Sequence, residues 1–162
     1  MLVQKYGGSV LADFQGFHAA ERLVNRYADR EPVVVVLSAV YGVTDLMIEA
    51  MALAADGQDW WQPGEEIEAR ERALVAGVAE AGLDTRELDE ILAERQEQLR
   101  SRLEGVRLLG DCPDKSRAAI LASGENLSSR LMAGYLRLMG VDARWSDSDL
   151  LPPANDSWLD SL

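Results

Sequence analysis

The sequence predicts an α/β fold built around a parallel sheet. Two short apolar runs, Leu2–Tyr6 and Val33–Leu37, are typical of buried strands. Between them, apolar side chains recur at helical spacing from Phe14 to Tyr27. A strand, a helix and a strand in this order predict two parallel neighbours, because the connection is too long for a hairpin and long enough for a crossover.

The carboxyl ends of the two predicted strands are each followed by an unusual turn. The first strand leads into Lys5–Ser9, and the second leads into Ser38–Thr44. In an open parallel sheet the carboxyl ends of neighbouring strands share one edge, and ligands bind at that edge. We therefore expect the two turns to lie close together.

After the second strand, the sequence predicts a series of helices. Residues Leu46–Leu53 form an apolar helix, and the polar and aromatic stretch that follows, through Gly64, is expected to be a loop. A charged helix covers Glu65–Gly82, and Asp84 with Glu87 predicts a capping-box start for another helix that runs to about Glu104. We expect this pair to be a solvated hairpin that leaves the sheet, with a coiled-coil dimer arm as the alternative.

The last third of the chain predicts two helices and one more strand. A helix follows Pro113 and reaches Leu121, Ser123-Gly124 interrupts it, and a second amphipathic helix ends at Gly140 as its C′ residue. Val141–Trp145 is interpreted as a third strand.

The length of 162 residues favours one domain. We expect it to span residues 1–150, with a helical insertion at about 63–110, and we expect residues 151–162 to be a loop or tail because Pro152-Pro153 interrupts any regular period.

Composition excludes several classes of function. The chain has 16 Lys and Arg but 28 Asp and Glu, which gives a formal charge of −12. Most of its surface therefore repels polyanions, so nucleic acid is not an expected partner. A phosphate site would have to be local, built from a few cations and backbone N–H groups. The lone Cys112 fits a reducing compartment, and no signal peptide or membrane-spanning run is apparent, so we expect a cytoplasmic protein without membrane partners.

The first turn joins a cation to a pair of glycines. Lys5 stands at the end of the first predicted strand, and Gly7, Gly8 and Ser9 follow it. Glycines allow backbone N–H groups to converge on an anion, and a helix that follows would add its dipole. The alternative is a tight strand-to-helix turn with a lysine that merely extends into solvent.

The second turn and a later segment offer polar groups. Ser38 and Thr44 could orient a small polar ligand, although Thr44 or Asp45 could instead cap the next helix. Glu125, expected in the first turn of a helix after Ser123-Gly124, could bind an ammonium group, the alternative being a helix cap at Ser123 with a solvated Glu125.

Metal and serine-nucleophile chemistry are not supported by the sequence. The only histidine, His18, has no partner at ligand spacing, and no acid cluster resembles a zinc or calcium site. No G-x-S-x-G elbow occurs. We therefore predict no metal-ligating residues in the chain.

Taken in order, the segments Val3–Ser9, Leu37–Asp45 and Ser123–Ser129 resemble aspartokinases of the amino acid kinase superfamily. The resemblance extends to Ala143 and covers the N-terminal portion of such a domain. It implies a truncated, three-layer α/β/α fold with a mainly parallel sheet, of the amino acid kinase-like, carbamate kinase-like type. It also implies transfer of the ATP γ-phosphate to the side-chain carboxylate of aspartate, with Mg²⁺ shielding the phosphates. The product, 4-phospho-aspartate, enters lysine, threonine and methionine biosynthesis.

The resemblance also implies a role for each motif residue. Lys5 would be the catalytic cation that stabilises the transferring charge, and Gly7, Gly8 and Ser9 would bind phosphate with it. Ser38 and Thr44 would position the amino acid, and Glu125 would hold its α-ammonium group.

Two departures from the family pattern keep other functions open. After Ser9, Val10-Leu11 is nearer to acetylglutamate kinases, which act on an acylated amino acid. The aspartokinase domain that this chain resembles is also nearly twice as long, and its later half carries most of the nucleotide-binding residues. We therefore expect the chain alone to be inactive, with a non-catalytic amino acid-binding or regulatory fragment as the alternative, and we expect its open sheet edge to favour a homo-oligomer.

Overall fold

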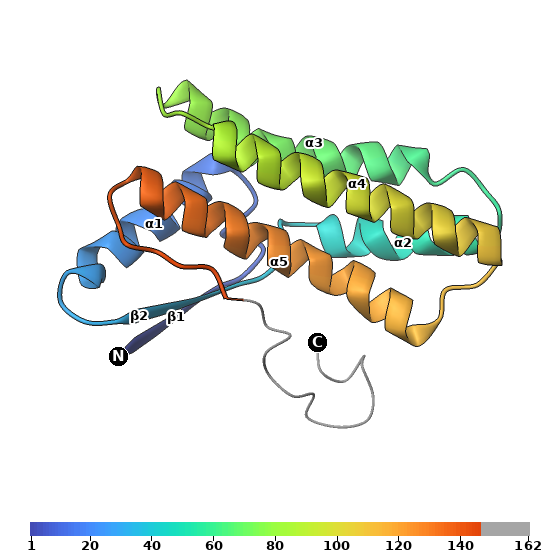
Figure 1. Ribbon diagram of the computed structural model, residues 1–162, viewed down its shortest axis with the longest axis horizontal. Helices are drawn as coiled ribbons and strands as arrows, with labels where there is room; N and C mark the ends of the chain where they lie inside the picture. The colour runs from blue at the N-terminus through green and yellow to red at the C-terminus, as the bar shows by residue number, and fades with distance from the viewer. Residues whose placement is uncertain (147–162) are drawn as a thin grey trace.

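The computed structural model describes residues 1–146, which form two strands and five helices (Figure 1). In chain order these are β1 (Leu2–Tyr6), α1 (Phe14–Ala28), β2 (Val33–Leu37), α2 (Val43–Ala55), α3 (Trp61–Glu80), α4 (Arg86–Leu109) and α5 (Asp114–Leu138). None of these five helices combines the length and the apolar character that a membrane span requires. The predicted tail, 151–162, lies outside the described residues.

The two strands are parallel neighbours, as predicted. Leu2 pairs with Val33 and Tyr6 pairs with Leu37, and α1 forms the connection between the strands. The N–H of Ser38 donates to the carbonyl of Tyr6 at 3.0 Å, so the ladder continues one residue beyond β2. The turns that follow β1 and β2 therefore leave the sheet at the same edge.

Helices cover one face of this small sheet and leave the other open. Figure 1 shows the helices stacked on one side of β1 and β2. On the opposite face Val3, Lys5, Val34 and Val36 are exposed, and the valines keep between 44% and 59% of their surface accessible. A parallel sheet is normally buried on both faces. The third layer of the predicted sandwich is thus not found within residues 1–146 and stays a prediction for a longer chain.

The helical hairpin differs from its prediction at its boundaries. α3 begins at Trp61 rather than Glu65, because Pro63 stands in the first turn, where a backbone N–H has no intrahelical partner to lose. α4 begins at Arg86 and has no capping box. Asp84 instead accepts hydrogen bonds from the backbone and side chain of Arg86, and these lower the pKa of its carboxyl group to about 2.

The hairpin is also part of the core, so the prediction of a solvated excursion is wrong. α3 packs on α2 and α1, and α4 packs on α2 and α5. Ile67, Leu74, Leu92 and Leu103 are each no more than 1% exposed. The sequence pattern showed the apolar stripe of α4 but not the helices it would pack against.

A buried ion pair joins the two helices of the hairpin. Arg95 Nη2 lies 3.0 Å from Glu71 Oε1, and the two side chains are only 3% and 1% exposed. Burial raises the pKa of Glu71 to about 7, because removing a carboxylate from water disfavours its charged form more than the neighbouring Arg95 favours it.

α5 is one continuous helix of 25 residues, so the predicted interruption at Ser123-Gly124 is wrong. Ser123 Oγ donates to the carbonyl of Ile120 at 2.6 Å, which satisfies the hydroxyl inside the helix. Gly124 is required by packing, because a Cβ at this position would lie 2.8 Å from Ala39 Cβ. The small residues mark a close contact between elements rather than a helix end.

The predicted third strand, Val141–Trp145, does not form. The N–H of Gly140 bonds to the carbonyl of Arg137 and that of Val141 to Leu136, which is the expected C′ glycine motif at the end of α5. Trp145 Nε1 then donates to Ser129 Oγ at 3.1 Å. These contacts hold residues 141–146 against α5, away from the edge of β2.

Candidate active site

The three motifs of the sequence meet around Ala39, just beyond the carboxyl end of β2. A Cβ placed on Gly8 would lie 3.2 Å from the carbonyl oxygen of Ala39. On the other side of the same residue, a Cβ on Gly124 would be within 2.8 Å of Ala39 Cβ. The turn after β1, the turn after β2 and the middle of α5 are therefore in close contact at one edge of the sheet.

The turn after β1 presents backbone donors. The carbonyls of Gly7 and Gly8 accept from Val10 and Leu11, each at 3.0 Å. The N–H groups of Gly7, Gly8 and Ser9 donate to no other group in residues 1–146. Consecutive N–H groups of this kind form a concave site for an anion.

The helix that follows this turn does not contribute its N-terminus, contrary to expectation. α1 begins only at Phe14, and Asp13 Oδ1 accepts from the N–H of Gly16 at 2.9 Å. The first turn of α1 is thus capped by the chain itself. An anion at Gly7–Ser9 has to be held by the turn and by nearby cations.

Lys5 supplies a cation on the open face of the sheet. It pairs with Val36 across the ladder and is exposed. Its ammonium group forms no ion pair or hydrogen bond with any residue of the described part of the chain. Because the ladder continues to Ser38, strand alternation places Ser38 on the same side as Lys5.

The turn after β2 ends in an uncapped helix. Gly42 is the N-cap of α2 with φ of +75°, and neither Thr44 nor Asp45 makes a side-chain cap, so the capping alternative for these two residues is wrong. Thr44 lies exposed in the first turn. The positive end of the α2 dipole therefore points into the edge where the motifs meet. In the sequence, Gly42 directly before the apolar Val43 is the local signal for a helix that begins at Val43 rather than near Leu46.

Glu125 reaches this edge from the helical layer. It lies near the middle of α5, not in a first turn, so the predicted stabilisation by a helix dipole is wrong. Its side chain is exposed and lines a groove between β2 and α5, and its backbone directly follows Gly124, which contacts Ala39. Lys5 and Glu125 approach from opposite faces of the sheet, and a ligand shared by both would sit beyond the strand ends.

Arg70 of α3 is a site neighbour that the sequence analysis did not find. Its Nη1 donates to the carbonyl of Tyr41 at 2.9 Å, in the middle of the turn after β2. No local pattern marks this arginine, because the contact joins residues 29 positions apart. Only the packing of α3 on α2 brings them together.

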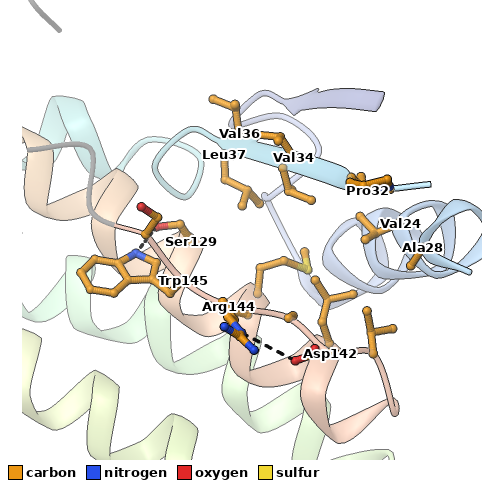
Figure 2. A pocket seen from close by; sticks show the side chains of 18 of the residues that line it. Val24, Ala28, Pro32, Val34, Val36, Leu37, Ser129, Asp142, Arg144 and Trp145 are labelled. Atoms are coloured by element: carbon orange, nitrogen blue, oxygen red, sulfur yellow. Dashed lines mark hydrogen bonds and ion pairs between the residues drawn. The ribbon is translucent and has the colours of Figure 1, made fainter. Parts of the chain in front are cut away.

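A groove of about 720 Å³ runs beside β2 (Figure 2). Its walls are β2, α5 and residues 141–146, and it includes Glu125 but not Lys5, Ser38 or Thr44. Figure 2 shows Trp145 beside Ser129 and the ion pair between Arg144 and Asp142 at one wall. We place the candidate site at the sheet edge, where the three motifs meet, because the groove is lined by no residue of the first motif and by only Leu37 of the second.

The single histidine has a structural partner. His18 Nδ1 lies 2.7 Å from Tyr135 Oη, which links α1 to α5. Burial raises the pKa of the Tyr135 hydroxyl. Within residues 1–146, no three His, Cys, Asp or Glu side chains gather in a way that could hold a metal ion.

Comparison with known proteins places the chain in one family. Residues 1–156 match the amino acid kinase family. The chain is 27% identical over 146 residues to the chloroplastic aspartokinase 3 of Arabidopsis thaliana, covering 90% of this chain and 25% of that protein. It is 28% identical over 161 residues to the lysine-sensitive aspartokinase 3 of Escherichia coli, covering 96% of this chain and 33% of that protein.

Solved structures show the same fold. E. coli aspartokinase III in complex with aspartate and ADP superposes with a TM-score of 0.74 at 24% identity, over 91% of this chain and 31% of that one. The aspartate kinase of Clostridium acetobutylicum gives a TM-score of 0.63 at 24% identity, over 85% of this chain and 29% of that one. The chain thus spans about a quarter to a third of the length of the relatives it matches.

Proposed function

Because the chain belongs to the amino acid kinase family, we propose that it carries the amino acid-binding side of an aspartokinase-like phosphotransferase. The reaction would move the γ-phosphate of ATP to the side-chain carboxylate of aspartate and give 4-phospho-aspartate. The observation that carries this proposal is the close contact of Gly8 and Gly124 with Ala39. That contact brings the Gly7–Ser9 turn, whose N–H groups are suited to phosphate, close to α5, the helix that carries Glu125.

The phosphate side of the site is assigned to the turn after β1. The N–H groups of Gly7, Gly8 and Ser9 are free of other partners in residues 1–146 and would donate hydrogen bonds to phosphate oxygens. Lys5, which is also unpaired there, would neutralise the charge that develops on the phosphoryl group. Catalysis of this kind consists mainly of positioning and charge neutralisation, which suits this set of residues.

ATP supplies the phosphoryl group when it is bound, and Mg²⁺ neutralises its phosphates. The donors of the Gly7–Ser9 turn fit phosphate oxygens, because they are N–H groups without a carboxylate among them. We assign no residue of this chain as a ligand of the metal ion. The chain's own part is to hold the acceptor amino acid and the transferring group.

The amino acid side of the site is assigned to the turn after β2 and to α5. Ser38 and Thr44 would hydrogen-bond the substrate, and the uncapped start of α2 would favour one of its carboxylates. Glu125 would pair with the α-ammonium group. An acylated amino acid has no ammonium group, so this contact favours free aspartate over the acetylglutamate-type substrate.

A second function would be that of a binding or regulatory unit, which uses the Ser38–Thr44 turn and Glu125 to bind an amino acid without transferring phosphate. The chain spans about a quarter to a third of the length of the relatives it matches, and their whole activity is not assigned to it. The open face of Val3, Val34 and Val36 supports the prediction that the chain pairs with another chain or a second copy of itself. The cytoplasmic location stays a prediction, and some relatives are chloroplastic.

Calorimetric titration separates these functions. We expect the chain to bind L-aspartate, to bind N-acetyl-L-aspartate at least about tenfold more weakly, and to lose aspartate affinity in Glu125→Gln. Asn126→Ala, which alters the next residue of α5, is the matched control. Tight binding of Mg-ATP in addition favours the enzyme, and aspartate binding alone favours the binding unit. Equal affinity for the two amino acids contradicts the ammonium contact.

A further inference from the structure

The turn between β2 and α2 is held from outside by an arginine of α3. Arg70 Nη1 donates to the carbonyl of Tyr41 at 2.9 Å. Its Nε donates to Glu66 Oε1, four residues earlier on the same helix, at 2.8 Å. The guanidinium group is planar and rigid, so the bond to Glu66 also fixes the direction of the bond to Tyr41.

The same guanidinium covers the backbone of Gly42. A Cβ at this position would lie only 2.0 Å from Arg70 Nη1. Gly42 also has φ of +75°, a conformation that side chains disfavour. The positive φ is what requires glycine at position 42, and the absence of a Cβ leaves the space that the end of the Arg70 side chain occupies.

The turn that Arg70 contacts lies between the two hydroxyls assigned to the amino acid. Ser38 precedes Tyr41 by three residues, and Thr44 follows it by three. Within the turn, one bond from the N–H of Val43 to the carbonyl of Val40, at 3.0 Å, closes the backbone. Tyr41 itself is 61% exposed, so its side chain adds little packing to hold the turn.

We propose that Arg70 is a positioning residue, which keeps the Ser38–Thr44 turn in the shape that binds the amino acid substrate. It acts through the carbonyl of Tyr41 and does not itself touch the substrate. This role rests on the proposed function, because it assigns the turn to substrate binding. It also gives α3, which packs on α2, a direct mechanical link to the site.

Hydrogen exchange and calorimetry on the whole chain test this role with three variants. Arg70→Ala should raise the exchange rate of the amides from 41 to 46 by about tenfold and weaken L-aspartate binding by a similar factor. Arg70→Lys should restore only part of both, because an ammonium group can donate to the same carbonyl but lacks the planar fork that Glu66 also holds. Arg72→Ala is the matched control, since Arg72 lies on the same helix but bonds to Gln96 of α4.

The outcomes distinguish a positioning role from a structural one. Faster exchange confined to the turn, with an unchanged Tm, supports the proposal. Unchanged exchange in Arg70→Ala overturns it, as does a general rise across α2 and α3 that Arg70→Lys does not reverse. If the wild-type chain binds no aspartate, the proposed function fails, and the exchange rates alone then decide whether Arg70 holds the turn.

Discussion

The sheet edge and the helical hairpin differ in whether their polar side chains are exposed and unpaired or buried and paired. At the sheet edge, Lys5, Thr44 and Glu125 are exposed and make no side-chain bond within the described residues. In the hairpin, Glu71 and Arg95 are almost fully buried and pair with each other. Buried charges that lose a partner are costly, whereas exposed unpaired charges cost little and remain free to bind a ligand.

This contrast separates stability from function in the molecule. The hairpin contributes apolar burial and a buried charged pair that joins α3 to α4. The sheet edge contributes groups whose removal should leave the fold intact. Substitutions of buried hairpin residues should therefore lower stability, whereas substitutions at the sheet edge should change ligand binding with little effect on stability.

The largest effect is expected from Glu71→Ala. The substitution leaves the Arg95 guanidinium buried without a partner, and arginine cannot escape by losing its proton. We expect the free energy of unfolding to fall by about 3–5 kcal/mol, measured by urea denaturation. Glu68→Ala is the control, because its partner Arg100 is 44% exposed and such pairs contribute about 0–1 kcal/mol. Equal losses in the two variants would contradict the contrast.

The same pair predicts a pH dependence of stability. Burial raises the pKa of Glu71 to about 7 from its ordinary 4.5, so the folded chain holds this proton more tightly than the unfolded chain does. The resulting stabilisation is complete below about pH 4.5 and is lost as the pH rises through about 7, by up to about 3 kcal/mol.

Thermal unfolding between pH 5 and 8 measures this slope. Glu71→Gln is the control, because its side chain has a similar shape and does not titrate. The slope should disappear in that variant. A slope that persists there assigns the pH dependence to other groups.

A smaller loss of stability is expected from a substitution at the contact between α5 and Ala39. Gly124→Ala places a Cβ 2.8 Å from Ala39 Cβ, so α5 must move away, and we expect a loss of about 1–3 kcal/mol together with weaker aspartate binding. Gly105→Ala is the matched control, because a Cβ there meets nothing within 4 Å and should stabilise α4 by about 0.5–1 kcal/mol. If both variants gain stability, α5 does not pack closely on Ala39.

The smallest effects on stability are expected from the site residues themselves. Lys5→Ala and Glu125→Gln should each change the free energy of unfolding by less than about 0.5 kcal/mol. In a longer, active form, Lys5→Ala should lower kcat far more than it weakens aspartate binding, and Glu125→Gln should chiefly raise KM for the amino acid. Steady-state kinetics of such a form provide the check. A strong loss of stability in either variant would contradict the proposal that the sheet-edge residues contribute little to stability.

Much of the fold could be predicted from local patterns. The parallel pairing of Leu2–Tyr6 with Val33–Leu37 followed from two apolar runs and the helix between them. The positions of the first two turns at one sheet edge followed from that pairing. The C′ role of Gly140 was also a local signal, and it is confirmed.

The features that local patterns did not predict share one physical cause, which is tertiary packing. Ser123-Gly124 was interpreted as a helix break because small residues often end helices, but Gly124 allows α5 to approach Ala39. Val141–Trp145 has the alternation of a strand, yet contacts with α5 hold it. The burial of the hairpin and the contact of Arg70 with Tyr41 depend on how helices distant in sequence pack together, and no local pattern encodes that.

Amide chemical-shift mapping during a titration with L-aspartate would show where on the chain the amino acid binds. If one amino acid site lies where the motifs meet, the shifts should be concentrated in residues 5–9, 38–45 and 123–126, with α3 and α4 changing little beyond Arg70. Shifts confined to the groove lined by Val33, Val35 and Ala143 would contradict this placement, and so would an absence of any saturable change.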